Sequence, residues 1–249
     1  MSLFNRSQTR SAAARNHAFI TIESHVPATL PGWAHTQAVI LIAPRIGAKF
    51  AEYFVQLAAG ATSALPPTDV QRFVFVLEGV LTCVVNNQTL TLSAGSYVYL
   101  PPNTPHQFHA TADARAVIIE KRYVPVAGVP PPHLVSGIAA EQPSRALGGD
   151  PDLQVTPLLP DTPSFDMAMN IMAFAPGAAL GLVEVHVMEH GLLMLSGQAI
   201  YRLDDRWYPV QQGDVIYMAP FCPQWCAAFG KTRTAYLLYK DWNRDPFGY

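Results

Sequence analysis

The chain has 249 residues, half of them hydrophobic, and a formal net charge of −2 from 16 basic and 18 acidic side chains. Only 14% of its residues are charged, against roughly a quarter in a typical soluble domain. This predicts strands buried on both faces and, with them, a homo-oligomer. The absence of a basic stripe argues against nucleic acid as a partner. No apolar segment reaches the roughly 20 residues that span a bilayer, so we expect no membrane partner either.

The first predicted unit is an antiparallel β-barrel or jelly roll over residues 15–125. Short alternating segments punctuated by Gly, Pro and Asn fill this range. Residues 81–92, for example, indicate two strands around a turn at Asn86 and Asn87. Strands of this length favour closure into a small barrel.

A Pro-rich crossover is predicted over residues 126–163, and a second barrel over residues 164–249. The crossover contains three consecutive prolines from Pro130, which favour an extended backbone. It also contains Leu and Val residues, so we expect it to pack on the barrels. The methionines near the start of the second barrel are interpreted as core residues.

The two barrels are predicted to be copies of one unit. Leu77-Glu-Gly79 recurs as Leu195-Ser-Gly197, and Gly95 recurs as Gly213, both at an offset of 118 residues. The same offset relates His106 to Gln224. Three coincident spacings without a gap indicate a tandem repeat, so the expected fold is all-β with two tandem barrels.

The second copy contains a concentrated set of metal-binding residue types. Glu184 and His186 alternate with valines, so they would share one face of a strand. His190 would lie about 13 Å farther along an uninterrupted strand. We therefore predict a turn near residues 188–191 that returns His190 to the same site, where Gln224 adds an amide oxygen.

Two alternatives involve the same region. His186-Val-Met-Glu-His190 matches the H-x-x-E-H pattern of inverted zinc peptidases, but that pattern requires a helix, whereas these flanks are β-branched. Cys222 and Cys226 flank Gln224 and raise the alternative of a thiolate ligand. Small buried thiols are the default interpretation. Three cysteines and no signal-peptide core indicate reduced thiols in a cytoplasm.

The donor set suits manganese or iron(II), and zinc would also bind it. The first barrel has Pro66, Thr68 and Arg72 at the equivalent positions and retains only His106. It therefore lacks the metal ligands, and we predict one metal ion per chain.

The pattern Glu184-x-His186-x3-His190-x6-Gly197, followed by Gly213 and Gln224, resembles the two cupin motifs, and the whole chain resembles a bicupin. More specifically, it is similar to the (S)-ureidoglycine aminohydrolases of purine-ring (allantoin) catabolism. The similarity includes the segments 122–126, 165–167, 175–177, 207–210 and 236–244.

This resemblance implies a manganese-dependent enzyme that hydrolyses (S)-ureidoglycine, a small ureido amino acid, to (S)-ureidoglycolate and ammonia. It assigns the metal to Glu184, His186, His190 and Gln224, and substrate binding to Glu184, Gln224, Tyr236 and Lys240. Glu184 and Lys240 are the expected catalytic residues, Glu184 as proton carrier and Lys240 as partner of the substrate carboxylate. A strand-end lysine that reaches solvent is the alternative for Lys240. A cupin dioxygenase and a non-catalytic metabolite-binding bicupin remain alternatives for the whole protein.

Overall fold

The computed structural model describes residues 9–244, and its backbone divides into two compact β units. The N-terminal unit contains residues 26–142 and 162–166, and the C-terminal unit contains residues 9–25, 143–161 and 167–244. The predicted all-β class is confirmed. The helical segments of the described chain are three-residue 3-10 turns, and none of its helices could cross a membrane.

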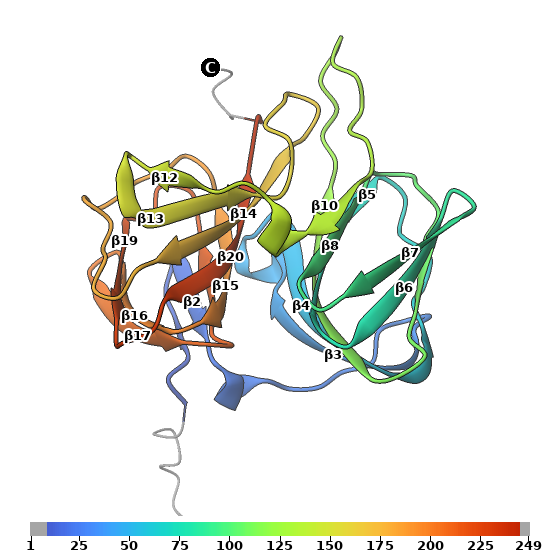
Figure 1. Ribbon diagram of the computed structural model, residues 1–249, viewed down its shortest axis with the longest axis horizontal. Coiled ribbons are helices and arrows are strands. Elements are labelled where there is room, and N and C mark those ends of the chain that lie inside the picture. The colour runs from blue at the N-terminus through green and yellow to red at the C-terminus, as the bar shows by residue number, and fades with distance from the viewer. Residues whose placement is uncertain (1–8, 245–249) are drawn as a thin grey trace, which may run out of the picture. The chain divides into compact units, whose positions relative to one another are not determined.

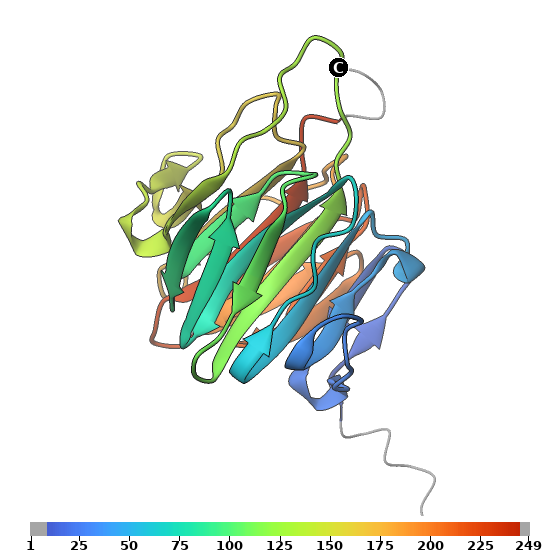
Figure 2. The same ribbon diagram turned by 90° about the vertical axis from the view of Figure 1, so that its right-hand side faces the viewer.

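The N-terminal unit is one curled antiparallel sheet (Figures 1 and 2). Its strand order is β11-β8-β5-β10-β4-β9-β6-β7, with β3 paired to β4. Its elements are β3 (Ala34–Ile42), η3 (Pro44–Ile46), β4 (Phe50–Thr62), β5 (Val70–Glu78), β6 (Val80–Val85), β7 (Gln88–Ser93), β8 (Ser96–Leu100), β9 (His106–His109), β10 (Ala114–Arg122), β11 (Val135–Ile138) and η4 (Ala139–Glu141).

The C-terminal unit contains an eight-stranded sheet, β1-β2-β18-β15-β20-β14-β13-β12, and a three-stranded sheet, β17-β16-β19 (Figure 1). Its elements are β1 (Ala12–Ala13), β2 (His17–Ile20), η2 (Ile22–Ser24), β12 (Arg145–Leu147), β13 (Asp150–Pro157), β14 (Met167–Phe174), β15 (His190–Ser196), β16 (Gln198–Leu203), β17 (Arg206–Gln211), β18 (Val215–Met218), β19 (Gln224–Phe229) and β20 (Thr234–Asp241).

The internal repeat is visible in the strand order. Strands β5 to β10 recur as β15 to β20, and β6 and β7 recur at the predicted offset of 118 residues. Gly79 and Gly197 end the first strand of each copy with φ of +75°. A Cβ atom there would lie 2.5 Å from the backbone oxygen of Asp113 or 2.7 Å from that of Arg233. Only glycine fits these two tight turns.

The expected boundaries of the units were inaccurate at both ends of the first barrel. Strand β2, which we placed in the N-terminal barrel, pairs with β18 of the C-terminal unit. The predicted crossover contains β11, which pairs with β8, and β12 and β13, which extend the C-terminal sheet through β14. Residues 245–249 of the predicted second barrel lie outside the described residues.

Each unit has its own apolar core. Alternate residues of the strands fill the N-terminal core, for example Val55, Val74 and Ile118, whereas Phe174, Leu192 and Tyr201 belong to the C-terminal core. Asn86 and Asn87 both have positive φ, +50° and +59°, in the predicted turn between β6 and β7. This is the backbone geometry of the tight hairpin turn that asparagine favours.

Candidate active site

The C-terminal unit contains a cavity of about 440 Å³ between the strands of its two sheets. All six residues that the sequence singled out line this cavity: Glu184, His186, His190, Gln224, Tyr236 and Lys240. They come from the 181–189 segment and from the strands β15, β19 and β20. The fold therefore brings together residues that lie up to 56 positions apart in the chain.

The segment that contains Glu184 and His186 alternates as predicted but is not a regular strand. Glu184 forms one isolated bridge with Gln224, in which each backbone N–H donates to the partner's oxygen at 2.8 and 2.9 Å. Val183 and Val185 are 38% and 55% exposed, whereas Glu184 and His186 line the cavity. The backbone then bends, and His190 opens β15. The predicted turn before His190 is confirmed.

The two imidazoles lie beside each other, and their hydrogen bonding differs. His186 Nε2 is 3.1 Å from Glu184 Oε2, and the rings of His186 and His190 are stacked with centroids 5.3 Å apart. Nε2 of His190 is buried without a hydrogen-bond partner in the described chain. Burial, with a smaller contribution from Lys240, lowers the pKa of His190 to about 3. His190 is therefore a neutral imidazole with an electron pair available to a ligand.

The described residues contain no group of three His, Cys, Asp or Glu side chains already arranged around a metal ion. The donor chemistry nevertheless fits one. A neutral imidazole with an unpartnered buried nitrogen, a second imidazole, a carboxylate and an amide line one cavity. This is the set of nitrogen and oxygen donors that divalent manganese and iron accept. An unpaired buried nitrogen is costly, so His190 Nε2 is a candidate ligand atom for a metal ion.

Two buried tyrosines, Tyr201 and Tyr236, line the same cavity as Gln224. The hydroxyl of Tyr201 donates to Gln224 Oε1 at 3.3 Å, and the rings of Tyr201 and Tyr236 are 6.4 Å apart in an edge-to-face arrangement. Burial raises the pKa of both phenols well above 10, so both remain protonated hydrogen-bond donors. The sequence analysis missed Tyr201. Tyr201 lies two residues before Leu203 and therefore on the same face of β16, and Leu203 pairs with Gln224. This period of two in the strand is the signal that could have placed Tyr201 beside Gln224.

Lys240 lines the cavity. It lies on β20 directly opposite His190 on β15 and is half-buried. Burial lowers the pKa of its ammonium, and the nearby Glu184 carboxylate opposes that effect. An ammonium that is poorly solvated in a cavity is suited to pair with an anionic group of a ligand.

The structure answers both alternatives that the sequence raised. The residues from His186 to His190 form no helix, so the inverted zinc-peptidase geometry is absent from the described chain. Cys222 and Cys226 are buried, do not line the cavity, and have thiol pKa values that burial raises to about 11 and 12. They are therefore neutral thiols and not candidate ligands.

The equivalent position in the N-terminal unit is occupied by a guanidinium group. Arg72 lies opposite Glu120 on β10, as His190 lies opposite Lys240 on β20. Arg72 is 2% exposed, pairs with Glu120 at 2.6 Å, and donates from Nη1 to His106 Nε2 at 2.8 Å. Because His106 Nδ1 is 2.7 Å from the Thr104 oxygen, to which it donates, its Nε2 is the acceptor. That nitrogen is therefore already used.

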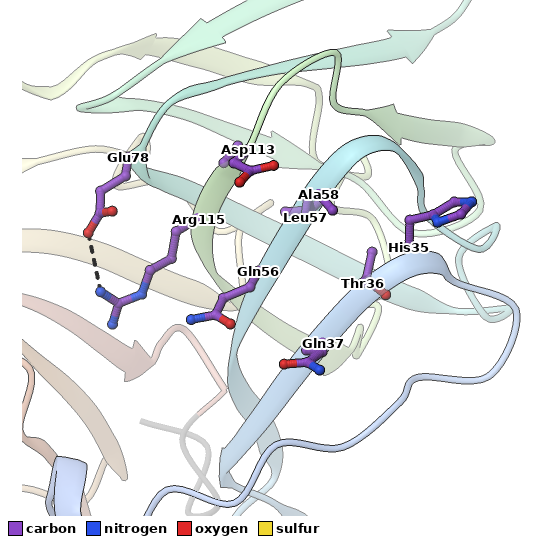
Figure 3. A pocket seen from close by; sticks show the side chains of 10 residues that line it. His35, Thr36, Gln37, Gln56, Leu57, Ala58, Glu78, Asp113 and Arg115 are labelled. Carbon is purple, nitrogen blue, oxygen red and sulfur yellow. Dashed lines mark hydrogen bonds and ion pairs between the residues drawn. The ribbon is translucent and has the colours of Figure 1, made fainter.

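A larger hollow of about 610 Å³ in the N-terminal unit has no comparable chemistry (Figure 3). Its charged residues include Glu78 and Arg115, which pair with each other at 3.3 Å and are 70% and 32% exposed. The Asp113 carboxylate accepts the backbone N–H of Ala59. These polar groups are solvated or satisfied, so we place the active site in the C-terminal cavity.

Comparison with known proteins identifies the family of the chain. Residues 53–120, in the N-terminal unit, match the cupin domain family. The chain is 48% identical to the probable (S)-ureidoglycine aminohydrolase of Oryza sativa subsp. japonica, over 96% of this chain and 77% of that protein. It is 45% identical to the (S)-ureidoglycine aminohydrolase of Arabidopsis thaliana, over 96% of this chain and 80% of that protein.

Solved structures show the same fold. The crystal structure of the protein Ylba from E. coli superposes with a TM-score of 0.85 at 36% identity and covers 95% of this chain and 96% of that one. The oxalate decarboxylase of Bacillus subtilis, studied for its Mn(II) centers, has a TM-score of 0.71 at 14% identity and covers 94% and 80% of the two chains. With these identities over nearly its whole length, the chain belongs to the (S)-ureidoglycine aminohydrolase family of cupin proteins.

Proposed function

We propose that the protein hydrolyses (S)-ureidoglycine to (S)-ureidoglycolate and ammonia with the help of a manganese ion. The observation that carries this proposal is the convergence of the six predicted residues in one cavity of a chain 45% identical to such an enzyme. In the reaction the bond between the α-carbon and the amino nitrogen breaks, and a bond to a water oxygen replaces it.

Glu184, His186, His190 and Gln224 would hold the metal. When bound, the ion would act as a Lewis acid and a template for the substrate. The oxygen and nitrogen donors favour manganese or iron(II) over metals that prefer thiolates, although zinc also accepts them. Tyr201 donates to the Gln224 oxygen and so helps to fix which way the amide points.

Lys240 is the proposed anchor of the substrate carboxylate. Its ammonium lines the cavity and is poorly solvated, so an ion pair with the substrate replaces hydration that is already weakened. Tyr236 lies four residues earlier on the same face of β20 and keeps its hydroxyl proton. It can therefore donate a second hydrogen bond to the substrate.

Glu184 is the proposed proton carrier. Its carboxylate lies 3.1 Å from His186 at the open side of the site and is 30% exposed. The amino nitrogen would take a proton from the Glu184 carboxyl group and depart as ammonia, while the electron pair of the ureido nitrogen forms a C=N bond and leaves a cationic iminium. Water would then add to the iminium carbon and give a proton to the Glu184 carboxylate, which regenerates the carboxyl group. One group that first gives and then takes a proton would therefore serve both steps.

Ammonia release from freshly prepared ureidoglycine, measured together with bound metal and oxygen uptake on one sample, tests the proposal. We expect stoichiometric ammonia and ureidoglycolate without oxygen consumption. Oxygen uptake would favour a cupin dioxygenase instead, and saturable binding without turnover would favour a metabolite-binding protein. Glu184→Gln should abolish turnover, while Glu78→Gln, an exposed glutamate of the other unit, should not change it.

A further inference from the structure

Asn170 adds a neutral carboxamide to the wall of the cavity, and none of the roles above uses it. It lies on β14 directly opposite Leu238 of β20, and Figure 1 shows these two strands as neighbours. Because alternate residues of a strand share a face, it shares the cavity face with Tyr236 and Lys240, which lie on either side of Leu238. Asn170 is thus a diagonal cross-strand neighbour of both proposed substrate contacts.

The hydrogen-bonding capacity of Asn170 is free for a ligand. Its side chain is half-buried and makes no hydrogen bond within the described residues. Two other polar groups of the cavity are already engaged, since the Gln224 oxygen accepts from Tyr201, and Trp242 donates to Asp161 at 2.8 Å. A carboxamide offers one carbonyl acceptor and two N–H donors, so it can donate and accept at once.

This capacity matches the part of the substrate that still lacks a partner. Lys240 suits the carboxylate, and Glu184 suits the amino group that leaves. The remaining ureido group is neutral, with a carbonyl that accepts and a terminal amine that donates. Diagonal neighbours on adjacent strands lie roughly 7–8 Å apart, so Lys240 and Asn170 can contact opposite ends of one small molecule.

We infer that Asn170 is the specificity-determining residue for the ureido group. Its amide nitrogen donates to the ureido carbonyl, and its amide oxygen accepts from the terminal ureido amine. The identity of the substrate rests on the proposed function, but the recognition of a carboxylate joined to a ureido group can be tested separately. Substrates with an apolar group in place of the terminal amine should bind poorly, because they leave the Asn170 oxygen without a donor.

Two stable ligands isolate this contact. N-Carbamoylglycine ends in an NH2 group where N-acetylglycine has a methyl group, and the two ligands are otherwise the same. Neither carries the α-amino group that the reaction releases. Calorimetric titration of the manganese-loaded protein should show about tenfold tighter binding of N-carbamoylglycine, the ratio expected for one net hydrogen bond. In Asn170→Leu the ratio of the two dissociation constants should fall close to one.

Control variants keep the experiment decisive. Met172→Leu changes an apolar residue on the same face of β14 and should keep the wild-type ratio. Asn170→Ser, which also removes the carboxamide, gives a second measurement if Asn170→Leu unfolds. A wild-type ratio in either Asn170 variant, or equal affinities in the wild type, overturns the inference. Discrimination between the ligands without ammonia release from ureidoglycine would overturn the proposed function alone.

Discussion

Lys240 is the residue whose substitution best separates substrate binding from metal binding and from folding. Lys240→Met keeps the length and the apolar part of the side chain and removes only the charge. A hydrogen bond to a charged group contributes about 1.5–3 kcal/mol. We therefore expect kcat/KM for ammonia release to fall roughly ten- to a hundredfold, and further if the substrate also loses its orientation.

The same variant should not lose stability. Burial lowers the pKa of Lys240, so the folded state binds its proton less readily than the unfolded chain does. The charged ammonium therefore costs stability at neutral pH, and methionine removes that cost. For the same reason, this lysine adds stability to the wild type as the pH rises from its lowered pKa towards the ordinary lysine value. Lys240→Met should lack that gain.

Steady-state ammonia release, elemental analysis and urea unfolding at neutral and alkaline pH would measure these effects. Lys231→Met is the matched control, because Lys231 is exposed in the loop after β19, and its kinetics and stability should match the wild type. An unchanged kcat/KM in Lys240→Met would place the lysine outside the substrate site. Loss of metal or of folded protein would show that the lysine is structural, which would refute the reasoning above.

Three further expectations concern the metal and the N-terminal unit. Elemental analysis should give one divalent ion per chain, and two tightly bound ions would contradict the single site. His186→Ala and His190→Ala should empty the site, whereas Gln224→Ala should retain metal because water can replace a neutral amide. Equal metal loss in all three variants would contradict that ranking. Arg72→Met should lower the free energy of unfolding by about 3 kcal/mol, since it leaves the Glu120 carboxylate unpaired, and urea unfolding showing no change would disprove that role.

The repeated part of the fold could be predicted because its signals are local. Alternating residues, turn asparagines and paired glycines such as Gly79 and Gly197 act over a few positions, and they recur in both copies. The pairing of β2 with β18 could not be predicted in this way. It joins segments about 200 residues apart, and nothing in the composition of residues 17–20 indicates which sheet they extend. The short strands within residues 135–157 were not predicted, because the prolines around them indicated an extended crossover.

The same distinction applies to the active site. Glu184, His186 and His190 form a compact motif, so the sequence placed them together without knowledge of the fold. Lys240 and Tyr236 entered through a family resemblance. Asn170 was missed because it stands among the methionines of β14, which indicated a core strand. Its role depends on β14 lying beside β20, and that adjacency is a property of the sheet order.

The two barrels differ in how the charge at their centres is balanced, and this explains why only one would bind a ligand. In the N-terminal barrel, the Arg72 guanidinium already has a carboxylate and an imidazole as partners. Its charge and the electron pair of His106 are both satisfied, so an added cation would be repelled and would find no free donor. In the C-terminal barrel, the positive charge lies on the opposite strand at Lys240, and His190 has an unpartnered nitrogen. Buried groups in that condition are costly without a partner, so this barrel, unlike the other, offers a free nitrogen donor to a cation and an ammonium to an anionic ligand.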